Sequence, residues 1–205
     1  AGSDLPADHT SSRRIPEPRV YWSARDAADT AAQSLLSFDS DAQATDALEG
    51  VLSKAVGGQM LSDVSLGAFL SGGIDSSTIV SLMQAQSSQP VRTFAIGFHE
   101  KGYDEAQHAK AVAMHLGTDH TELYVTADDA LAVVPGLADM YDEPFADSSQ
   151  IPTSLVTRMA RQHVTVALSG DGGDELFGGY SRYFRVNNWW QKCERIPSLL
   201  RTPAG

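Results

Sequence analysis

Apolar residues along this chain occur in two kinds of block that follow one another in a regular order. Blocks with helical spacing begin at residue 42, and the segment 42–57 presents one apolar face, formed by Ala44, Ala47, Leu48, Val51, Leu52 and Ala55. Short apolar blocks without that spacing predict buried strands. We expect helices over 42–57, 76–86, 104–116, 127–139 and 151–162, and strands over 64–70, 91–98, 119–125 and 164–168.

This alternation of strands and helices predicts the fold class. Parallel strands joined by crossover helices form a sheet that helices cover on both faces. We therefore expect an α/β fold with a twisted parallel sheet in a Rossmann-like, three-layer arrangement. In such sheets ligands bind beyond the carboxyl ends of the strands, where the strand order changes direction. The loops after residues 70, 97 and 168 are thus the places where chemistry is expected.

Residues 1–41 differ from the rest of the chain. They contain three prolines and many Ser, Asp and Ala residues, without a sustained apolar period. We predict a linker or arm over 1–41 and one domain over 42–205. Two interpretations of the first segment stay open: an arm that docks through Val20, Tyr21 and Trp22, or a flexible end.

Composition narrows the classes of function. The formal net charge of −11 argues against a general nucleic-acid binder, which needs clustered Lys and Arg. It leaves room for one bound nucleotide, because backbone N–H groups and a metal ion can hold phosphates. The single cysteine, Cys193, excludes an internal disulfide. No apolar stretch reaches membrane-spanning length and the N-terminus lacks a signal peptide, so we expect a cytoplasmic protein.

The loop after the first predicted strand has the residues of a phosphate-binding turn. It reads Ser71-Gly72-Gly73-Ile74-Asp75-Ser76-Ser77. The two glycines let the backbone approach an anion, the following helix supplies N–H groups, and the three serines add hydroxyl donors. The Walker and dinucleotide motifs are absent, and no lysine neutralises charge here. We therefore expect a metal ion held by Asp75. The alternative is a tight turn with a capping residue.

The loop after the fourth predicted strand is rich in glycine and carboxylates. The string from Leu168 to Tyr180 reads LSGDGGDELFGGY, with carboxylates at Asp171, Asp174 and Glu175. Three carboxylates this close repel one another unless a cation or strong hydrogen bonds stabilise them. Mg²⁺ bridging ATP phosphates is the natural candidate, and a solvated acidic turn is the alternative. We expect the two glycine-rich turns to converge on one triphosphate and its Mg²⁺.

The two strings resemble known family motifs. The first is similar to the SGGxDS pyrophosphate loop of the N-type ATP pyrophosphatases. The second resembles the LSG(E/D)GxDE(L/V)FGGY signature of asparagine synthetases and their β-lactam-forming relatives. The resemblance covers roughly residues 42–190. It implies an adenine nucleotide α hydrolase-like fold and a ligase that uses ATP and Mg²⁺ to adenylate the side-chain carboxylate of aspartate, after which ammonia displaces AMP.

The resemblance also implies roles for particular residues. Asp75 and Asp174 match the Mg²⁺-binding carboxylates, and Asp171 stands where some members have Glu, near the activated substrate, so Asp171 and Asp174 are the catalytic candidates. Tyr180 matches a closing tyrosine that is either functional or a packed aromatic, and Ser148 lies near the expected acceptor pocket. The positions expected to bind the nucleotide are Phe69, Leu70, Ser71, Gly72, Gly73, Asp75, Ser76, Ser77, Ile96, Ser169 and Gly170.

The resemblance also shows what the sequence lacks. Glutamine-dependent members carry a glutaminase domain and a C-terminal helical region with a catalytic lysine, and neither has a counterpart here. We expect a C-terminally truncated fragment that binds ATP but turns over poorly. If the surface around Trp189 and Trp190 is exposed, self-association into a homo-oligomer is expected. Two alternatives remain: a carboxylate-adenylating amidotransferase or β-lactam-synthetase-like enzyme, and a non-catalytic nucleotide-binding module.

Overall fold

The computed structural model describes residues 17–99, 105–144 and 146–194. The chain divides into two units, Ala1–Thr45 and Asp46–Gly205. In the first unit, helix α1 (Ala24–Gln33) begins at Ser23, whose hydroxyl accepts a hydrogen bond from the Asp26 N–H at 3.3 Å. None of its residues is buried. This helix is an element that the sequence pattern did not predict, and the linker or arm over 1–41 stays a prediction.

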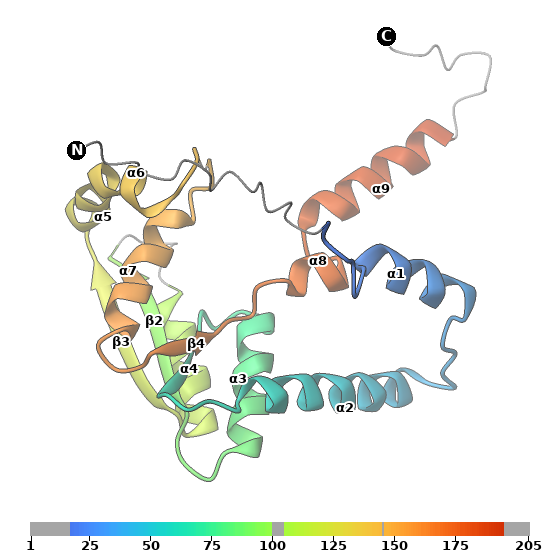
Figure 1. Cartoon of the computed structure of the whole chain (residues 1–205), viewed down its shortest axis with the longest axis horizontal. Coiled ribbons are helices and arrows are strands. Elements are labelled where there is room, and N and C mark those ends of the chain that lie inside the picture. The colour runs from blue at the N-terminus through green and yellow to red at the C-terminus, as the bar shows by residue number, and fades with distance from the viewer. Residues whose placement is uncertain (1–16, 100–104, 145, 195–205) are drawn as a thin grey trace, which may run out of the picture. The chain divides into compact units, whose positions relative to one another are not determined.

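The described part of the second unit contains a four-stranded parallel sheet (Figure 1). Its strands are β1 (Leu66–Phe69), β2 (Arg92–Phe98), β3 (Asp119–Val125) and β4 (Val166–Leu168). The order across the sheet is β3-β2-β1-β4. The chain thus builds outward from β1 to β3 and then returns to the other side of β1 for β4. The strand order changes direction at β1, so the loops after β1 and β4 lie next to each other.

The helices follow the predicted order, with some changes in length. Pro135 lies in a short 3₁₀ turn that divides the helix expected over 127–139. Gly117 ends its helix with φ 71°, as a left-handed cap. The helices are α2 (Asp41–Gln59), α3 (Ile74–Gln86), α4 (Ala106–Leu116), α5 (Ala127–Val133), η1 (Val134–Gly136), α6 (Leu137–Met140), α7 (Gln150–Ala160), α8 (Gly173–Phe177) and α9 (Ser181–Glu194). The sequence pattern did not predict α8 and α9.

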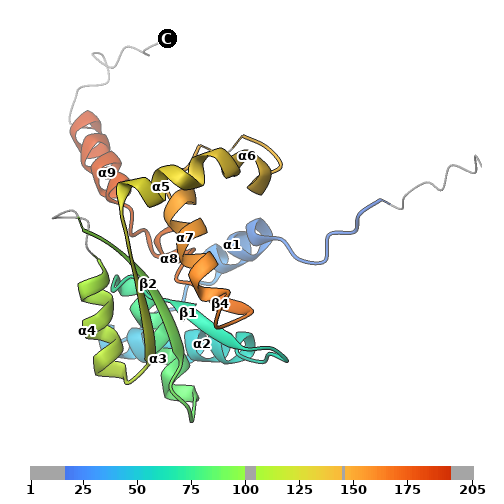
Figure 2. The same cartoon turned by 90° about the vertical axis from the view of Figure 1, so that its left-hand side faces the viewer.

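Apolar side chains on the two faces of the sheet form two sides of the core. Ala68 of β1 and Leu70, which follows β1, pack with residues of α2, α3 and α4 on one face. Phe94 of β2, with Phe69 and Ile96 around it, packs against α7 on the other face, where α5 also contributes to the core. Figure 2 shows this arrangement of helices on both sides of the strands. The three-layer α/β fold with a parallel sheet is confirmed.

The predicted apolar face of the first domain helix is only partly correct. Leu48 and Val51 are 42% and 67% exposed, whereas Val56, outside the predicted face, is buried. Leu52, Val56 and Met60 are the residues from this region that contact the core. Only the last turns of α2 therefore pack against the other elements. None of the helices in the described ranges has both the length and the apolar character needed to cross a membrane.

A polar network lies on the face of the sheet covered by α4. The fully buried Thr93 hydroxyl lies 2.8 Å from His120 Nδ1 and 3.0 Å from the Thr118 hydroxyl. Across the imidazole ring, His120 Nε2 lies 3.6 Å from Glu122 Oε1, which is also 3.6 Å from Lys110 Nζ. Burial lowers the pKa of His120 below its ordinary 6.5; Glu122 opposes this shift and Lys110 adds to it.

Because of this network, we expect the free energy of unfolding to decrease as the pH is lowered below 6.5, the ordinary pKa of His. Because the pKa of His120 is lower in the folded chain, the unfolded chain binds a proton first as the pH falls. The stability that neutral His120 contributes is therefore complete above pH 6.5 and is lost as the pH falls toward the pKa of the folded state. We expect His120→Gln to reduce the loss of stability between about pH 7.5 and about pH 5.5, measured by urea unfolding. An identical loss in both proteins would contradict this role.

Candidate functional site

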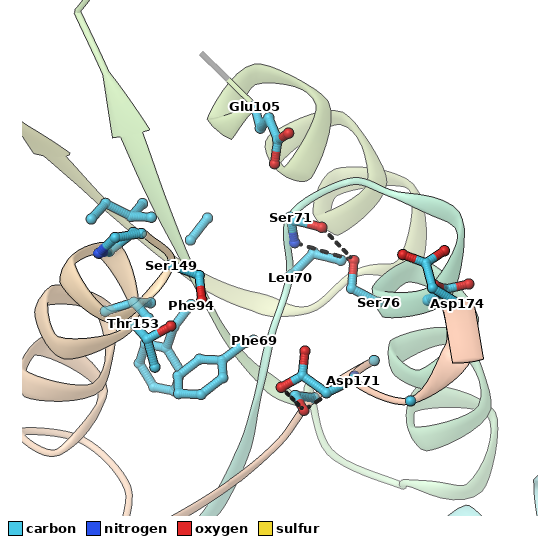
Figure 3. Close-up of a pocket in the computed structure, with 18 of the residues that line it drawn as sticks. Phe69, Leu70, Ser71, Ser76, Phe94, Glu105, Ser149, Thr153, Asp171 and Asp174 are labelled. Carbon is cyan, nitrogen blue, oxygen red and sulfur yellow. Dashed lines mark hydrogen bonds between the residues drawn. The ribbon is translucent and has the colours of Figure 1, made fainter. Parts of the chain in front are cut away.

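A cavity of about 720 Å³ opens at the carboxyl ends of β1, β2 and β4 (Figure 3). It lies where the strand order changes direction, because Ala68 of β1 pairs with both Thr93 of β2 and Leu168 of β4. Its lining combines apolar rings, hydroxyls and carboxylates. The lining residues are Phe69, Leu70, Ser71, Asp75, Ser76, Phe94, Ala95, Ile96, Glu105, Asp147, Ser149, Pro152, Thr153, Val156, Ser169, Gly170, Asp171, Gly172, Asp174, Glu175 and Tyr180.

The turn after β1 is held close to α4. Gly72 has φ +79°, and a Cβ there would lie 2.5 Å from the backbone nitrogen of Ala109. Only glycine fits both this conformation and this contact. Gly73 then caps α3, and the first intrahelical bond runs from the Ser77 N–H to the Gly73 carbonyl at 3.0 Å. The preceding N–H groups of Ile74, Asp75 and Ser76 have no intrahelical acceptor, as at the helix starts where anions commonly bind.

The three predicted hydroxyl donors do not lie together. Ser71 and Ser76 line the cavity, and their hydroxyl oxygens are 2.9 Å apart. Ser77 faces a separate hollow between α3 and α4, which Ser81 and His115 also line. Its hydroxyl oxygen is buried and has no hydrogen-bond partner among the described residues. Gly72 and Gly73 do not line the cavity. They determine the backbone conformation of the turn.

The turn after β4 packs directly against the turn after β1. A Cβ at Gly170 would lie 2.7 Å from the Ser76 backbone nitrogen and 2.9 Å from the Asp75 carbonyl carbon. A Cβ at Gly173 would lie 2.5 Å from the Asp75 carboxyl carbon. Glycine at these positions therefore lets the two turns touch. The structure brings Ser71, Asp75 and Ser76 to one cavity with Ser169, Gly170, Asp171 and Asp174.

Six carboxylates line this cavity, and no Lys, Arg or His side chain of the described chain joins them. Several of the six are satisfied by neighbouring donors. The Ser169 hydroxyl donates to Asp171 at 2.9 Å. The Ser149 N–H donates to Asp147 at 2.8 Å, which lowers the pKa of that carboxyl.

Asp75 and Asp174, like Glu105, lack such donors among the described residues. Within the described ranges, neither side chain has a hydrogen bond or an ion pair. Carboxylate oxygens are preferred ligands of Mg²⁺, which usually binds one or two of them and completes its shell with water and phosphate. No group of three or more His, Cys, Asp or Glu among the described residues is placed to hold a metal. Two carboxylates would supply only part of the shell of a Mg²⁺ ion, and water and a phosphate ligand would have to complete it.

Tyr180 forms one wall of the cavity and connects it to α9. Its hydroxyl donates to Glu175 at 2.5 Å, which raises the pKa of Tyr180 to about 12 and lowers the pKa of Glu175. The Arg182 guanidinium lies 4.1 Å from the centre of the Tyr180 ring. Tyr180 is therefore held at the cavity by Glu175, which precedes it in the sequence, and by Arg182, which follows it.

The opposite part of the cavity is apolar. In the view of Figure 3, Phe69 and Phe94 lie beside Thr153 of α7, away from Ser71, Ser76 and Asp174. The predicted nucleotide contacts Phe69, Leu70 and Ile96 all line this cavity. A flat apolar surface of this kind suits a purine ring.

Sequence reasoning missed part of the lining. Alternation along β2 places Phe94 and Ile96 on the same face, so that signal was present. Helical spacing relates Thr153 and Val156 in the same way. Glu105 and Asp147 lie in two short strings, 103–106 and 142–148, that resemble the same family, but the sequence assigns them no role in a site, and the fold brings them to the cavity. Ser148, expected near the acceptor pocket, is exposed and lies between two lining residues.

Comparison with known proteins identifies the family. The family model described as "Asparagine synthase" matches residues 47–204. The chain is 44% identical over 143 residues to Asparagine synthetase (glutamine-hydrolyzing) 1 of Bacillus subtilis, covering 69% of this chain and 22% of that protein. It is 36% identical over 163 residues to Asparagine synthetase (glutamine-hydrolyzing) 2 of Oryza sativa subsp. japonica, covering 71% and 27%.

Among solved structures, the chain is similar to an NH3-dependent NAD synthetase from Campylobacter jejuni. The TM-score is 0.47 at 14% sequence identity, over 66% of this chain and 60% of that one. The chain spans about a quarter of the length of the curated relatives that it matches. By the family model over 47–204 and these relatives, the chain belongs to the asparagine synthase family.

Proposed function

We propose that this chain forms the nucleotide-binding part of a ligase that adenylates the side-chain carboxylate of aspartate and amidates it with ammonia. The observation that carries the proposal is the contact between the two glycine-rich turns. That contact brings a helix start with open N–H groups to one cavity with Asp75 and Asp174, whose carboxylates have no hydrogen bond or ion pair within the described residues. Family membership and the names of the relatives support the reaction type.

In this proposal ATP lies along the cavity with its adenosine against Phe69, Leu70 and Ile96. Its phosphates lie at the turn of Ser71, Gly72 and Gly73, where the start of α3 donates N–H groups. Ser169 and Gly170 contact the nucleotide from the second turn. Asp75 and Asp174 hold Mg²⁺, which supplies charge neutralisation at the phosphate oxygens.

The reaction joins the aspartate carboxylate to the α-phosphorus of ATP. A carboxylate oxygen attacks that phosphorus, the bond to the bridging oxygen breaks, and pyrophosphate leaves with the bonding electrons. Ammonia then attacks the acyl carbon, and AMP leaves. In such phosphoryl transfer, positioning and electrostatic stabilisation provide most of the rate enhancement. Asp171 lines the cavity from the second turn. We propose that it faces the activated substrate, as its match to the acidic residue of the family signature implies.

The described lining of the cavity is strongly acidic. Six carboxylates face a polyanionic substrate, and no basic side chain of the described chain lines the cavity to offset them. We propose that productive turnover needs a cationic side chain from regions that the longer relatives have in addition. On this basis the isolated chain binds Mg²⁺·ATP and releases pyrophosphate slowly.

Calorimetric titration tests the proposal directly. We expect ATP to bind in the presence of Mg²⁺ and to lose measurable binding when the metal is chelated. A pyrophosphate-release assay with aspartate, and with other carboxylates as alternatives, then tests the acceptor. If the chain is folded and shows no binding of Mg²⁺·ATP in the titration, the proposed nucleotide binding is overturned. Robust asparagine formation by the isolated chain would overturn the expectation of slow turnover.

A further inference from the structure

Helix α4 connects the cavity to the polar network on the face of the sheet that it covers. Glu105, just before the first residue of α4, lines the cavity (Figure 3). One turn further on, the backbone nitrogen of Ala109 lies so close to Gly72 that a Cβ there would be 2.5 Å away. The Nζ atom of Lys110, the next residue, lies 3.6 Å from Glu122 of β3. The position of α4 on β3 therefore affects both a wall of the cavity and the support of the turn after β1.

Small side chains pack α4 against the sheet. Its buried residues are Ala106, Ala109 and Ala113, each at most 2% exposed. Alanine buries little apolar area, so these contacts supply less hydrophobic stabilisation than larger side chains would. The ion pair between Lys110 and Glu122 thus contributes a larger share of what positions this helix.

The imidazole ring of His120 carries a proton on both nitrogens when it is charged, whichever nitrogen carries the proton of the neutral ring. Nδ1 lies 2.8 Å from the Thr93 hydroxyl, whose oxygen can accept. Nε2 is buried without a hydrogen-bond partner among the described residues, and Glu122 Oε1 lies 3.6 Å from it. The two side chains are only 10% and 15% exposed, so water screens their attraction weakly. Protonation of His120 therefore draws Glu122 Oε1 toward Nε2.

Lys110 and His120 compete for the same oxygen of Glu122. Oε1 lies 3.6 Å from Lys110 Nζ as well as 3.6 Å from His120 Nε2. The Lys110 side chain is 60% exposed, so its ammonium group can turn to water, whereas the enclosed ring cannot. Lys110 and Glu122 are the charges that act on His120, while the neighbouring Arg92 and Asp119 pair with each other at 4.0 Å. A charged His120 thus displaces Lys110, which it also repels.

We propose that His120, Glu122 and Lys110 form a proton-sensitive switch on α4: protonation of His120 takes Glu122 from Lys110, loosens α4 on β3, and weakens nucleotide binding in the cavity. The effect on binding rests on the proposed function, whereas the loosening of α4 does not. Burial keeps the pKa of His120 below 6.5, so the ion pair with Lys110 is intact at neutral pH and is lost in mild acid.

Titration calorimetry with Mg²⁺·ATP at about pH 7.5 and about pH 5.5 tests the switch in the wild type and in His120→Gln. ATP itself gains a proton over this range, and the comparison of the two proteins removes that effect. The wild type should lose affinity by about threefold to fivefold more than the variant, the range expected for a partly exposed ion pair. An equal loss in both proteins overturns the inference.

Linkage requires a reciprocal effect of the nucleotide on His120. Saturation with Mg²⁺·ATP should lower the pKa of His120, measured by NMR titration, by about 0.5–0.7. Lys110→Gln removes a positive charge near the ring, so it should raise this pKa. Lys54→Gln, in α2 and outside the cavity lining, is the matched control and should leave it unchanged. The inference is overturned if the pKa is the same in Lys110→Gln and the wild type.

Amide hydrogen exchange of the ligand-free chain tests the loosening of α4 without any nucleotide. The Ala109 N–H donates to the Glu105 carbonyl at 3.1 Å and reports on the start of the helix. Its protection, corrected for the pH dependence of the intrinsic exchange rate, should fall in acid in the wild type more than in His120→Gln. Equal protection in the two proteins overturns the switch. If this difference is present but the wild type binds no nucleotide, the proposed function fails while the switch stands.

Discussion

Replacing Asp75 with Asn is expected to weaken Mg²⁺·ATP binding by roughly 100-fold, because loss of a metal ligand should cost at least as much as loss of the groups that orient one. The substitution keeps the size of the side chain and removes its charge. Asp75 has no hydrogen bond or ion pair in the described chain, and other carboxylates line the same cavity. Removing one charge relieves repulsion but also removes a favourable negative charge from the first turn of α3, so the melting temperature should change little.

This combination separates ligand loss from misfolding. Titration calorimetry in Mg²⁺ measures affinity, and a thermal melt of the same sample measures stability. Asp128→Asn is the matched control, since Asp128 lies in the first turn of α5 and outside the cavity lining. Unchanged affinity in Asp75→Asn would remove this carboxylate from the proposed metal site.

Replacing Gly170 with Ala should reduce the free energy of unfolding by about 1–3 kcal/mol, the usual range for overpacking. The added methyl group would lie 2.7 Å from the Ser76 nitrogen and 2.9 Å from the Asp75 carbonyl carbon. Both are backbone atoms and cannot rotate aside. The two turns must separate, so nucleotide affinity should fall together with stability.

Gly50→Ala is the same chemical change as Gly170→Ala, but we expect it to raise the free energy of unfolding. A Cβ at Gly50, in the middle of α2, would meet nothing within 4 Å. Alanine has the higher helix propensity, so we expect a gain of about 0.5–1 kcal/mol in urea unfolding. If both variants behave alike, the close contact between the turns does not exist in solution.

The fold could be predicted from the sequence wherever apolar spacing reports burial. β3 begins and ends at the predicted residues, and α3 and α7 differ from prediction by no more than two residues at each end. The α2 face was partly wrong because helical spacing alone does not show which turns meet the sheet. α9 was missed because its large apolar residues, among them Trp189 at 72% exposure, form no buried stripe.

The candidate site shows a similar limit. The glycine-rich strings indicated which residues gather, since the motifs are continuous in sequence. They could not show which hydroxyl groups face the cavity. Ser76 and Ser77 are neighbours in the string, but one faces the cavity and the other the interface of α3 and α4. Glu105 and Asp147 reach the cavity only through the packing of α4 and α7.

The pairing of β1 with β4 also determines when such a site can form during synthesis. Only three residue pairs link β1 to β4, although most of the domain's sequence lies between the two strands. Pairing between residues so far apart in sequence is slow, because a long loop must close first. When a nascent chain has left the ribosome only as far as β3, it contains the turn after β1 but not yet the turn after β4. A bound nucleotide would then act as a clamp that secures the last strand to arrive.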